Sequence, residues 1–249
     1  MRTCLVTGAG RGIGRAVAVR LAAAGHRVAL TARSRDQLDE TASRLDGPGL
    51  VLPADITAPH AVDGLFERVE QEWGGVEVLV ANAGAAASAP LGRTTDQMWQ
   101  QQLDLNLTAP FRCTRRAVPG MVERGWGRVV VVASVAARRG EPYIVAYTAA
   151  KHGVLGMVRS VAAEVAGTGV TANAVCPGYV DTPMTDANVE RLAGRTGREA
   201  ADIRTGLAGK QPIGRLVTPD EVADAVLWCV GNAALNGQGI TLDGGGVQS

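Results

Sequence analysis

The chain has 249 residues, of which 46% are hydrophobic and 20% charged, and its 25 basic and 24 acidic residues leave a net charge of +1. This composition excludes disordered, collagen-like and coiled-coil chains, and a chain of this length can bury a full core without disulfides or metals. The small net charge offers no electrostatic footprint for nucleic acid or for an anionic membrane.

The cysteines and the N-terminus indicate the compartment. Cys4, Cys113, Cys176 and Cys229 lie far apart, with no Cys-x-x-Cys pair and no histidine at metal-ligand spacing, so we expect reduced thiols and no metal site. The chain begins with a strand-like run, without the apolar stretch of a signal peptide or the roughly 18 apolar residues of a membrane span. The sequence therefore predicts a cytoplasmic protein.

Short β-branched runs alternate with longer segments of helical periodicity, a pattern typical of a parallel sheet. The expected strands are Thr3 to Thr7, Val28 to Thr31, Leu50 to Leu52, Val76 to Ala81, Arg128 to Ala133, Val170 to Val175 and Gly239 to Leu242. The apolar runs at 78–80 and 129–132 do not alternate, as expected of strands that helices cover on both faces. We predict one α/β domain over residues 1–249, a Rossmann fold with a doubly wound, seven-stranded parallel sheet.

The stretch from 183 to 212 is irregular, with several Gly and Arg residues and weak periodicity. Such segments often carry function above a rigid scaffold, so we expect a mobile substrate lid here.

A glycine-rich turn follows the first strand and opens a helical stretch from Arg15 to Ala24. It reads Thr7-Gly8-Ala9-Gly10-Arg11-Gly12-Ile13-Gly14, in which Gly8, Gly12 and Gly14 form the essential set. Glycines allow close backbone approach, and the first N–H groups of a helix bind the pyrophosphate of a dinucleotide. The alternative is a tight turn without a ligand.

The end of the second strand bears on the choice of cofactor. NAD-binding Rossmann folds usually place an acidic residue there for the ribose 2′-OH, but this chain has Ala32-Arg33-Ser34. Arg33, with Arg11 from the glycine turn, can bind a 2′-phosphate, which favours NADP(H). The alternative is that both arginines are solvated surface charges.

Three residues suited to proton transfer follow in order. Ser134 ends the fifth strand, and thirteen residues later Tyr147 and Lys151 stand at i and i+4 on one helix face. The pKa of a free phenol, near 10, is too high for efficient proton exchange at neutral pH, but an adjacent ammonium and an oxidised nicotinamide stabilise the phenolate. We expect Tyr147 to be the acid/base and Ser134 to bind a substrate carbonyl.

With these motifs, and with Asn82-Ala83-Gly84, Asn106, Asn173 and Pro177-Gly178, the chain resembles the short-chain dehydrogenase/reductase family over nearly its whole length. The resemblance implies that Tyr147 is the general acid of ketone reduction and that Ser134 binds the carbonyl. It further implies that Lys151 lowers the pKa of the tyrosine and holds the nicotinamide ribose, and that Asn106 anchors a water of the proton relay.

The resemblance also implies where the cofactor is held. Asp55 and Ile56 would meet the adenine, Asn82 to Gly84 its ribose, and Pro177 to Thr182 the nicotinamide amide. The full set of expected cofactor-binding residues is Gly8, Arg11, Gly12, Ile13, Gly14, Arg33, Ser34, Asp55, Ile56, Asn82, Ala83, Gly84, Tyr147, Lys151, Pro177, Gly178, Val180 and Thr182.

Within the family the chain is most similar to bacterial 3-ketoacyl-thioester reductases and aromatic-polyketide ketoreductases. We therefore expect an NADPH-dependent reductase of a ketone, either free or thioester-linked. The resemblance also implies a homotetramer, in which the long helices from Thr95 to Glu123 and from Tyr147 to Ala166 pair with their copies and Trp228 to Gly245 makes a second two-fold contact. Two alternatives are an NAD-dependent alcohol or 3-hydroxyacyl-thioester dehydrogenase acting oxidatively, and a non-catalytic dinucleotide sensor. The complete set of Asn106, Ser134, Tyr147 and Lys151 argues against a sensor.

Overall fold

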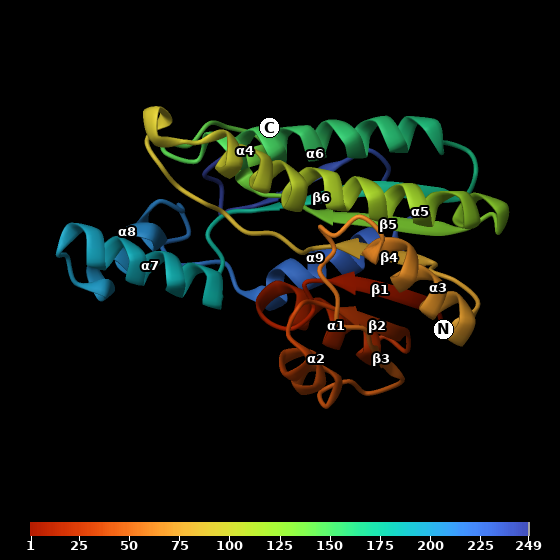
Figure 1. Cartoon of the computed structure of the whole chain (residues 1–249). Helices are drawn as coiled ribbons and strands as arrows, with labels where there is room; N and C mark the ends of the chain where they lie inside the picture. The colour runs from red at the N-terminus through yellow and green to blue at the C-terminus, as the bar shows by residue number, and fades with distance from the viewer. Residues whose placement is uncertain (249) are drawn as a thin grey trace.

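The computed structural model describes residues 1–248 as a central parallel sheet covered by helices on both faces (Figure 1). The strands are β1 Thr3–Thr7, β2 Arg27–Thr31, β3 Gly49–Val51, β4 Val78–Ala81, β5 Gly127–Val132, β6 Val170–Pro177 and β7 Gly239–Leu242. The α-helices are α1 Gly12–Ala23, α2 Arg35–Ala42, α3 Ala61–Trp73, α4 Asp96–Leu103, α5 Ala109–Glu123, α6 Val145–Glu164, α7 Pro183–Thr196, α8 Ala200–Gly209 and α9 Pro219–Gly231. Short helical turns lie at Leu91–Arg93 (η1), Asp104–Thr108 (η2) and Val135–Ala137 (η3).

The strands pair in the order β3-β2-β1-β4-β5-β6-β7, and every pair is parallel. The order reverses at β1, where β1 lies between β2 and β4, so the carboxyl ends of these strands open the crevice in which doubly wound sheets bind their ligands. The predicted seven-stranded, doubly wound parallel sheet is confirmed.

The core has one layer on each face of the sheet, because strands such as β5 are buried along their whole length. One hydrophobic cluster joins α3, α5 and α6 to the sheet, and the other joins α1, α2 and α9 to it (Figure 1). This two-sided burial explains why the valine runs of β4 and β5 show no polar alternation. The helices hold the strand ends, and hence the site, in a rigid frame.

One predicted element differs from the structure. The sequence predicted a single long helix from Thr95 to Glu123, but a π-helical turn, η2, separates α4 from α5. A π-turn adds a residue to the helical turn and is frequent at functional sites. Here it contains Asn106, which is fully buried and faces the loop after β4.

The segment predicted as a lid folds into two helices, α7 and α8, which extend beyond the edge of the sheet (Figure 1). They pack on each other through a third, small cluster built on Val189, Ile203, Leu207 and Leu216. The base of α7 is tied down by the bridge between Val180 and Val217, so the helix pair is anchored next to the carboxyl end of β6.

Two further features concern the whole described chain. All four cysteines are buried and free, as the sequence predicted. Within residues 1–248, none of the helices combines the length and apolarity required to span a lipid bilayer.

Candidate active site

The glycine turn after β1 requires glycine at three of its positions. Gly8 and Gly12 have φ angles of +66° and +55°, in the left-handed region that favours glycine. A Cβ at Gly14 would stand 2.2 Å from the Gly8 carbonyl oxygen and 2.5 Å from the Asn82 amide nitrogen. The three glycines that the sequence singled out are therefore each required by the backbone geometry or by close packing.

The N-terminus of α1 points out of this turn with its N–H groups uncapped. Arg11 occupies the cap position without a side-chain hydrogen bond, and the first turn of α1 holds no acidic residue. Uncapped N–H groups and the positive end of the helix dipole bind anions. The glycine turn from Gly8 to Gly14 and the N-terminus of α1, together called the glycine cradle, fit the pyrophosphate of a dinucleotide.

The loops after β1 and β4 are joined by hydrogen bonds. The backbone N–H groups of Asn82 and Ala83 both donate to the Thr7 hydroxyl at 3.0 Å, and the Asn82 side chain donates to the Thr7 carbonyl at 2.9 Å. Asn82 thereby holds the glycine turn rather than facing solvent. Sequence reasoning missed Thr7 as the partner of this asparagine.

The adenine end of the crevice carries exposed charges. Arg11 and Arg33 are both exposed, and neither forms an ion pair with another described residue. Asp55 accepts hydrogen bonds from Thr57, which hold the pKa of the carboxyl below its usual value, and the charge of nearby Arg33 adds to this effect. An anion between the two arginines would find unpaired guanidinium groups.

The neighbouring residues have structural contacts of their own. The Ser34 hydroxyl accepts from the N–H of Gln37 at 3.4 Å and so caps α2, while Ile56 is buried in the core. Arg35 pairs with Asp39 at 3.4 Å on α2. The expected contacts of Ser34 and Ile56 with the cofactor remain predictions.

Ser134, Tyr147 and Lys151 come together at the carboxyl end of β5. Ser134 caps the short turn η3 by accepting the N–H of Ala136 at 3.1 Å, and it also hydrogen bonds to the Tyr147 hydroxyl. The Lys151 ammonium lies 5.5 Å from the centre of the Tyr147 ring and donates to the Val132 carbonyl at 2.9 Å. Residues from a strand end and from the first turns of α6 thus form one cluster, as the sequence predicted.

Burial dominates the electrostatics of this cluster in the chain by itself. It raises the pKa of Tyr147 to about 12, against the opposing hydrogen bond from Ser134, and it lowers the pKa of Lys151 to about 8. Desolvation of the phenolate is the largest cause of this rise in the pKa of Tyr147. The expected lowering of that pKa by Lys151, together with an oxidised nicotinamide, remains a prediction.

Asn106 lies beside this cluster with one polar atom left free. Its side-chain nitrogen donates to the carbonyls of Ala85, at 2.9 Å, and of Gln102, at 3.1 Å. Its side-chain oxygen is buried and accepts no hydrogen bond from the described residues. A Cβ at Gly84 would stand 2.9 Å from that oxygen and 3.6 Å from the Lys151 nitrogen, so both groups face the same small space. A buried acceptor of this kind suits an ordered water.

The segment after β6 closes the other side of the crevice. Pro177 ends β6, the Gly178 N–H donates to the Leu242 carbonyl at 2.8 Å, and Val180 pairs with Val217. Thr182 caps α7 by accepting the N–H of Thr185. The same threonine would lie 3.2 Å from a Cβ at Gly12, which brings this segment against the glycine turn.

Two side chains that support the site were missed from the sequence. The Gln211 side chain accepts a hydrogen bond from the Tyr179 N–H and donates hydrogen bonds to the carbonyls of Tyr179 and Arg215. These bonds fix the segment around Gly178. Arg138 donates to the Gly239 carbonyl and contacts the buried Cys176 thiol. Neither residue belongs to a spacing motif, so only the fold could identify them.

Comparison with known proteins agrees with this geometry. Residues 2–193 match the short chain dehydrogenase family. D-beta-hydroxybutyrate dehydrogenase of Rhizobium meliloti (strain 1021) is 34% identical, with 98% of each chain covered. The 3-oxoacyl-[acyl-carrier-protein] reductase MabA of Mycobacterium tuberculosis is 41% identical over 98% of this chain and 92% of that protein.

A solved structure shares the whole fold. The crystal structure of a tryptophan variant of actinorhodin polyketide ketoreductase with NADPH superposes with a TM-score of 0.95 at 34% identity, covering 99% of this chain and 98% of that chain. The described architecture, including the helices beyond the sheet edge, is thus that of a known dehydrogenase fold.

We expect Gly14→Ala to abolish dinucleotide binding and to lower stability, because its Cβ would overlap backbone atoms of Gly8. Calorimetric titration with NADPH and thermal unfolding measure the two effects. Gly64→Ala in α3 is the matched control, since its Cβ meets no other atom within 4 Å. Equal NADPH affinity in the Gly14 and Gly64 variants would contradict the cradle.

Proposed function

The chain belongs to the short-chain dehydrogenase family, and from that premise we propose that it is an NADPH-dependent reductase of ketones, 3-ketoacyl or polyketide-like carbonyls among them. The observation that carries the proposal is the cluster of Ser134, Tyr147 and Lys151 beside the glycine cradle. The relatives named as ketoacyl reductases and the NADPH complex of a similar ketoreductase support it.

Each group of the cluster has a chemical task. When bound, the reduced nicotinamide would supply a hydride to the carbonyl carbon. Ser134 donates a hydrogen bond to the substrate carbonyl, and Tyr147 donates its proton to the oxygen as negative charge develops there. The phenol is protonated at neutral pH and so can supply that proton as the alkoxide forms, and the same groups serve the reverse oxidation.

Lys151 and Asn106 support proton supply. The buried ammonium favours the phenolate that remains after transfer, and by the family resemblance it would also hold the nicotinamide ribose. The free side-chain oxygen of Asn106 anchors a water that leads toward Lys151. Through this water the tyrosine regains its proton.

Arg33, with Arg11, gives the preference for NADP(H), because a 2′-phosphate would meet two exposed guanidinium groups. No acidic residue stands at the end of β2 to repel that phosphate.

The second candidate function is an oxidative, NAD-linked dehydrogenase of a hydroxy acid or hydroxyacyl thioester. The relative named D-beta-hydroxybutyrate dehydrogenase favours it. Comparison of the two cofactors in both directions separates the candidates.

We further propose that residues 1–249 act as one catalytic domain in the cytoplasm, with 183–212 as a mobile lid. We also propose a homotetramer, in which the helices at Thr95 to Glu123 and Tyr147 to Ala166 pair with their copies and Trp228 to Gly245 makes a second two-fold contact. The exposed aromatic side chains of Trp99, Phe111 and Trp228 on these elements support the assembly.

The cofactor preference is tested with Arg33→Ala. We expect kcat/KM for NADPH to fall roughly ten- to hundred-fold while that for NADH changes little, as for the loss of one charge-assisted hydrogen bond. Arg35→Ala is the control, since Arg35 pairs with Asp39 in the same segment. An unchanged NADPH preference in the Arg33 variant would refute the assignment.

The proton donor is tested with Tyr147→Phe. Because only a hydroxyl is lost, the fold and the NADPH affinity should persist while kcat falls by roughly two to four orders of magnitude. Lys151→Ala should also raise the KM for NADPH, since it removes a contact as well as a charge. Near-normal turnover by the Phe variant would place the proton donor elsewhere.

The assembly is tested by light scattering at micromolar concentration, where we expect four times the chain mass of 25.7 kDa. The mass of a single chain would exclude the tetramer.

A further inference from the structure

Helix α7 carries two arginines, Arg191 and Arg195, that form no ion pair with the described residues. The hydrogen bonds and ion pairs of the described residues give Arg191 one partner, the neutral side-chain oxygen of Asn188. One terminal nitrogen of Arg191 is buried without any hydrogen-bond partner. By contrast Arg204, on the neighbouring helix, is paired with both Asp181 and Asp186. The charge of Arg191 is therefore left uncompensated.

Helical spacing places the unused charge on one side of α7. Val189 and Ala193 pack against α8, whereas Arg191 and Arg195 lie on the opposite side, one turn apart. Two like charges at i and i+4 repel each other unless an anion lies between or beside them. Arg195 is exposed, and no acidic residue lies three or four positions before either arginine.

The other charges near this face do not neutralise it. Glu190 adjoins Arg191 in sequence, but a step of about 100° turns it toward another side of the helix. Asp186 already binds Arg204. Glu199 follows Arg195 by four positions but stands beyond the end of α7, after the left-handed Gly197.

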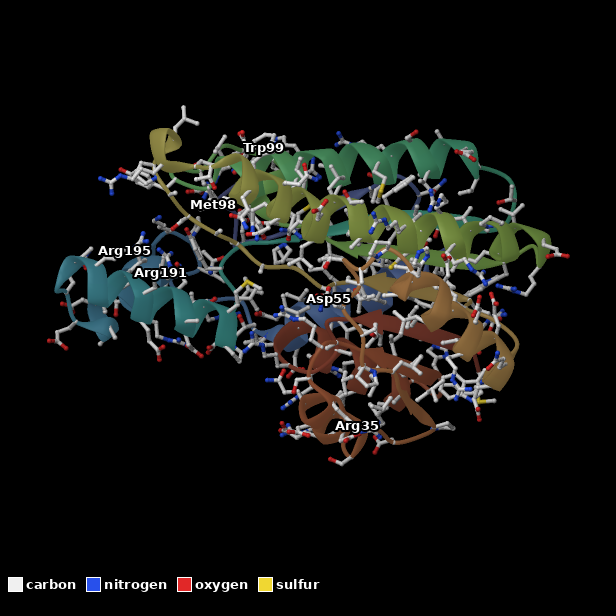
Figure 2. All side chains as sticks on the ribbon, in the orientation of Figure 1. Arg35, Asp55, Met98, Trp99, Arg191 and Arg195 are labelled. Carbon is white, nitrogen blue, oxygen red and sulfur yellow. The ribbon has the colours of Figure 1, made fainter. Side chains whose placement is uncertain are left out.

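The face also has an apolar end, nearer to the catalytic cluster. Met184, in the first turn of α7, is on the same side as the arginines and is 47% exposed. In Figure 2, Arg191 and Arg195 lie on the side of α7 that faces α4, and Met98 lies opposite them. From Met184 to Arg191 the helix rises seven residues, about 10 Å.

We propose that this face of α7, Met184 to Arg195, binds a substrate that carries an anionic group, a carboxylate or a phosphate, separated from the reacting ketone by an apolar chain. The inference rests on the proposed ketone reduction and names the class of its substrate. Methionine side chains line the path of the apolar chain, since they adapt to irregular shapes. The guanidinium groups then bind the anion in the fork geometry that suits carboxylates and phosphates.

The test measures binding to the NADP⁺-loaded protein by calorimetric titration, so that it does not depend on turnover. The probes are 9-oxodecanoate, its methyl ester, which has the same chain without the charge, and 3-oxobutanoate, whose carboxylate is too close to the ketone to reach α7. We expect 9-oxodecanoate to bind roughly ten-fold or more tighter than its ester, as for one charge-assisted hydrogen bond. Arg191→Gln and Arg195→Gln should each remove most of that difference and leave the binding of the ester and of 3-oxobutanoate unchanged.

Arg198→Gln is the matched control. It removes the same charge from the lid, but Arg198 lines the groove between α7 and α8 with Leu192 and Ile203. A phosphate monoester with the same apolar chain, 9-oxodecyl phosphate, distinguishes the sources of the anion. Weaker binding of this phosphate in the arginine variants identifies a phosphate, and weaker binding of 9-oxodecanoate alone identifies a carboxylate.

Equal affinity of the wild-type protein for 9-oxodecanoate and its ester, with no loss of 9-oxodecyl phosphate binding in either arginine variant, would overturn the inference. An effect of Arg198→Gln as large as that of Arg191→Gln would overturn it too. Failure of the proposed function would give another result. The NADP⁺-loaded protein would still bind 9-oxodecanoate more tightly than its methyl ester, but none of the probes would support oxidation of NADPH in a turnover assay.

Discussion

The buried ammonium of Lys151 is the group on which the rest of the site depends. It is 4% exposed and none of the described carboxylates pairs with it, so the Val132 carbonyl at 2.9 Å is its neutral anchor. Burying an unpaired charge is costly, and the cost appears in the pKa of the lysine, which burial lowers to about 8. The fold tolerates this cost between the end of β5 and the first turns of α6, which is where Tyr147 and Ser134 lie.

The same edge of the sheet explains why residues far apart in sequence act together. The glycine turn leaves β1, Asn82 follows β4, Ser134 follows β5 and Thr182 lies beyond β6, and parallel pairing brings these strand ends to one side. Hydrogen bonds from Asn82 to Thr7 and the contact of Thr182 with Gly12 then lock the turn in place. A cofactor held there would bridge the two halves of the sheet, with its charged end near Arg33 and its reactive end near Tyr147.

Much of this could be predicted from the sequence, because it follows from local patterns. Uninterrupted valine runs predict strands buried on both faces, and the order of glycine turn, Ser134, Tyr147 and Lys151 predicts a site at their carboxyl ends. The residue ranges of the strands agree with the predicted ones to within about two positions. These features require only the period of a strand or a helix and the topology of a parallel sheet.

The rest depends on packing that spacing does not encode. The π-turn at Asn106 interrupts a helical pattern that continues on both sides of it, and Gln211 reaches the backbone of Tyr179 from 32 residues away. The pKa of Tyr147 could not be predicted from its neighbours in sequence, since it depends on how completely the fold excludes water. The sequence also does not show that Arg191 lacks an acidic partner, because only the structure reveals that the nearby Asp181 and Asp186 pair with Arg204 instead.

The central claim is that Tyr147 becomes an efficient acid/base when a positive charge joins Lys151 beside it. Ultraviolet difference titration measures it directly, because the chain has only three tyrosines and Tyr147→Phe isolates the signal of one. In the protein alone the phenol should ionise near the raised value of about 12, above the ordinary value of 10.0. With saturating NADP⁺ we predict that Tyr147 ionises at clearly lower pH, because the cationic nicotinamide ring stabilises the phenolate. The phenolate is the base of the oxidative direction, so the oxidation rate should rise with pH through the same lowered pKa. An ionisation of Tyr147 that stays at the same pH, or moves higher, when NADP⁺ is added would contradict this account of the site.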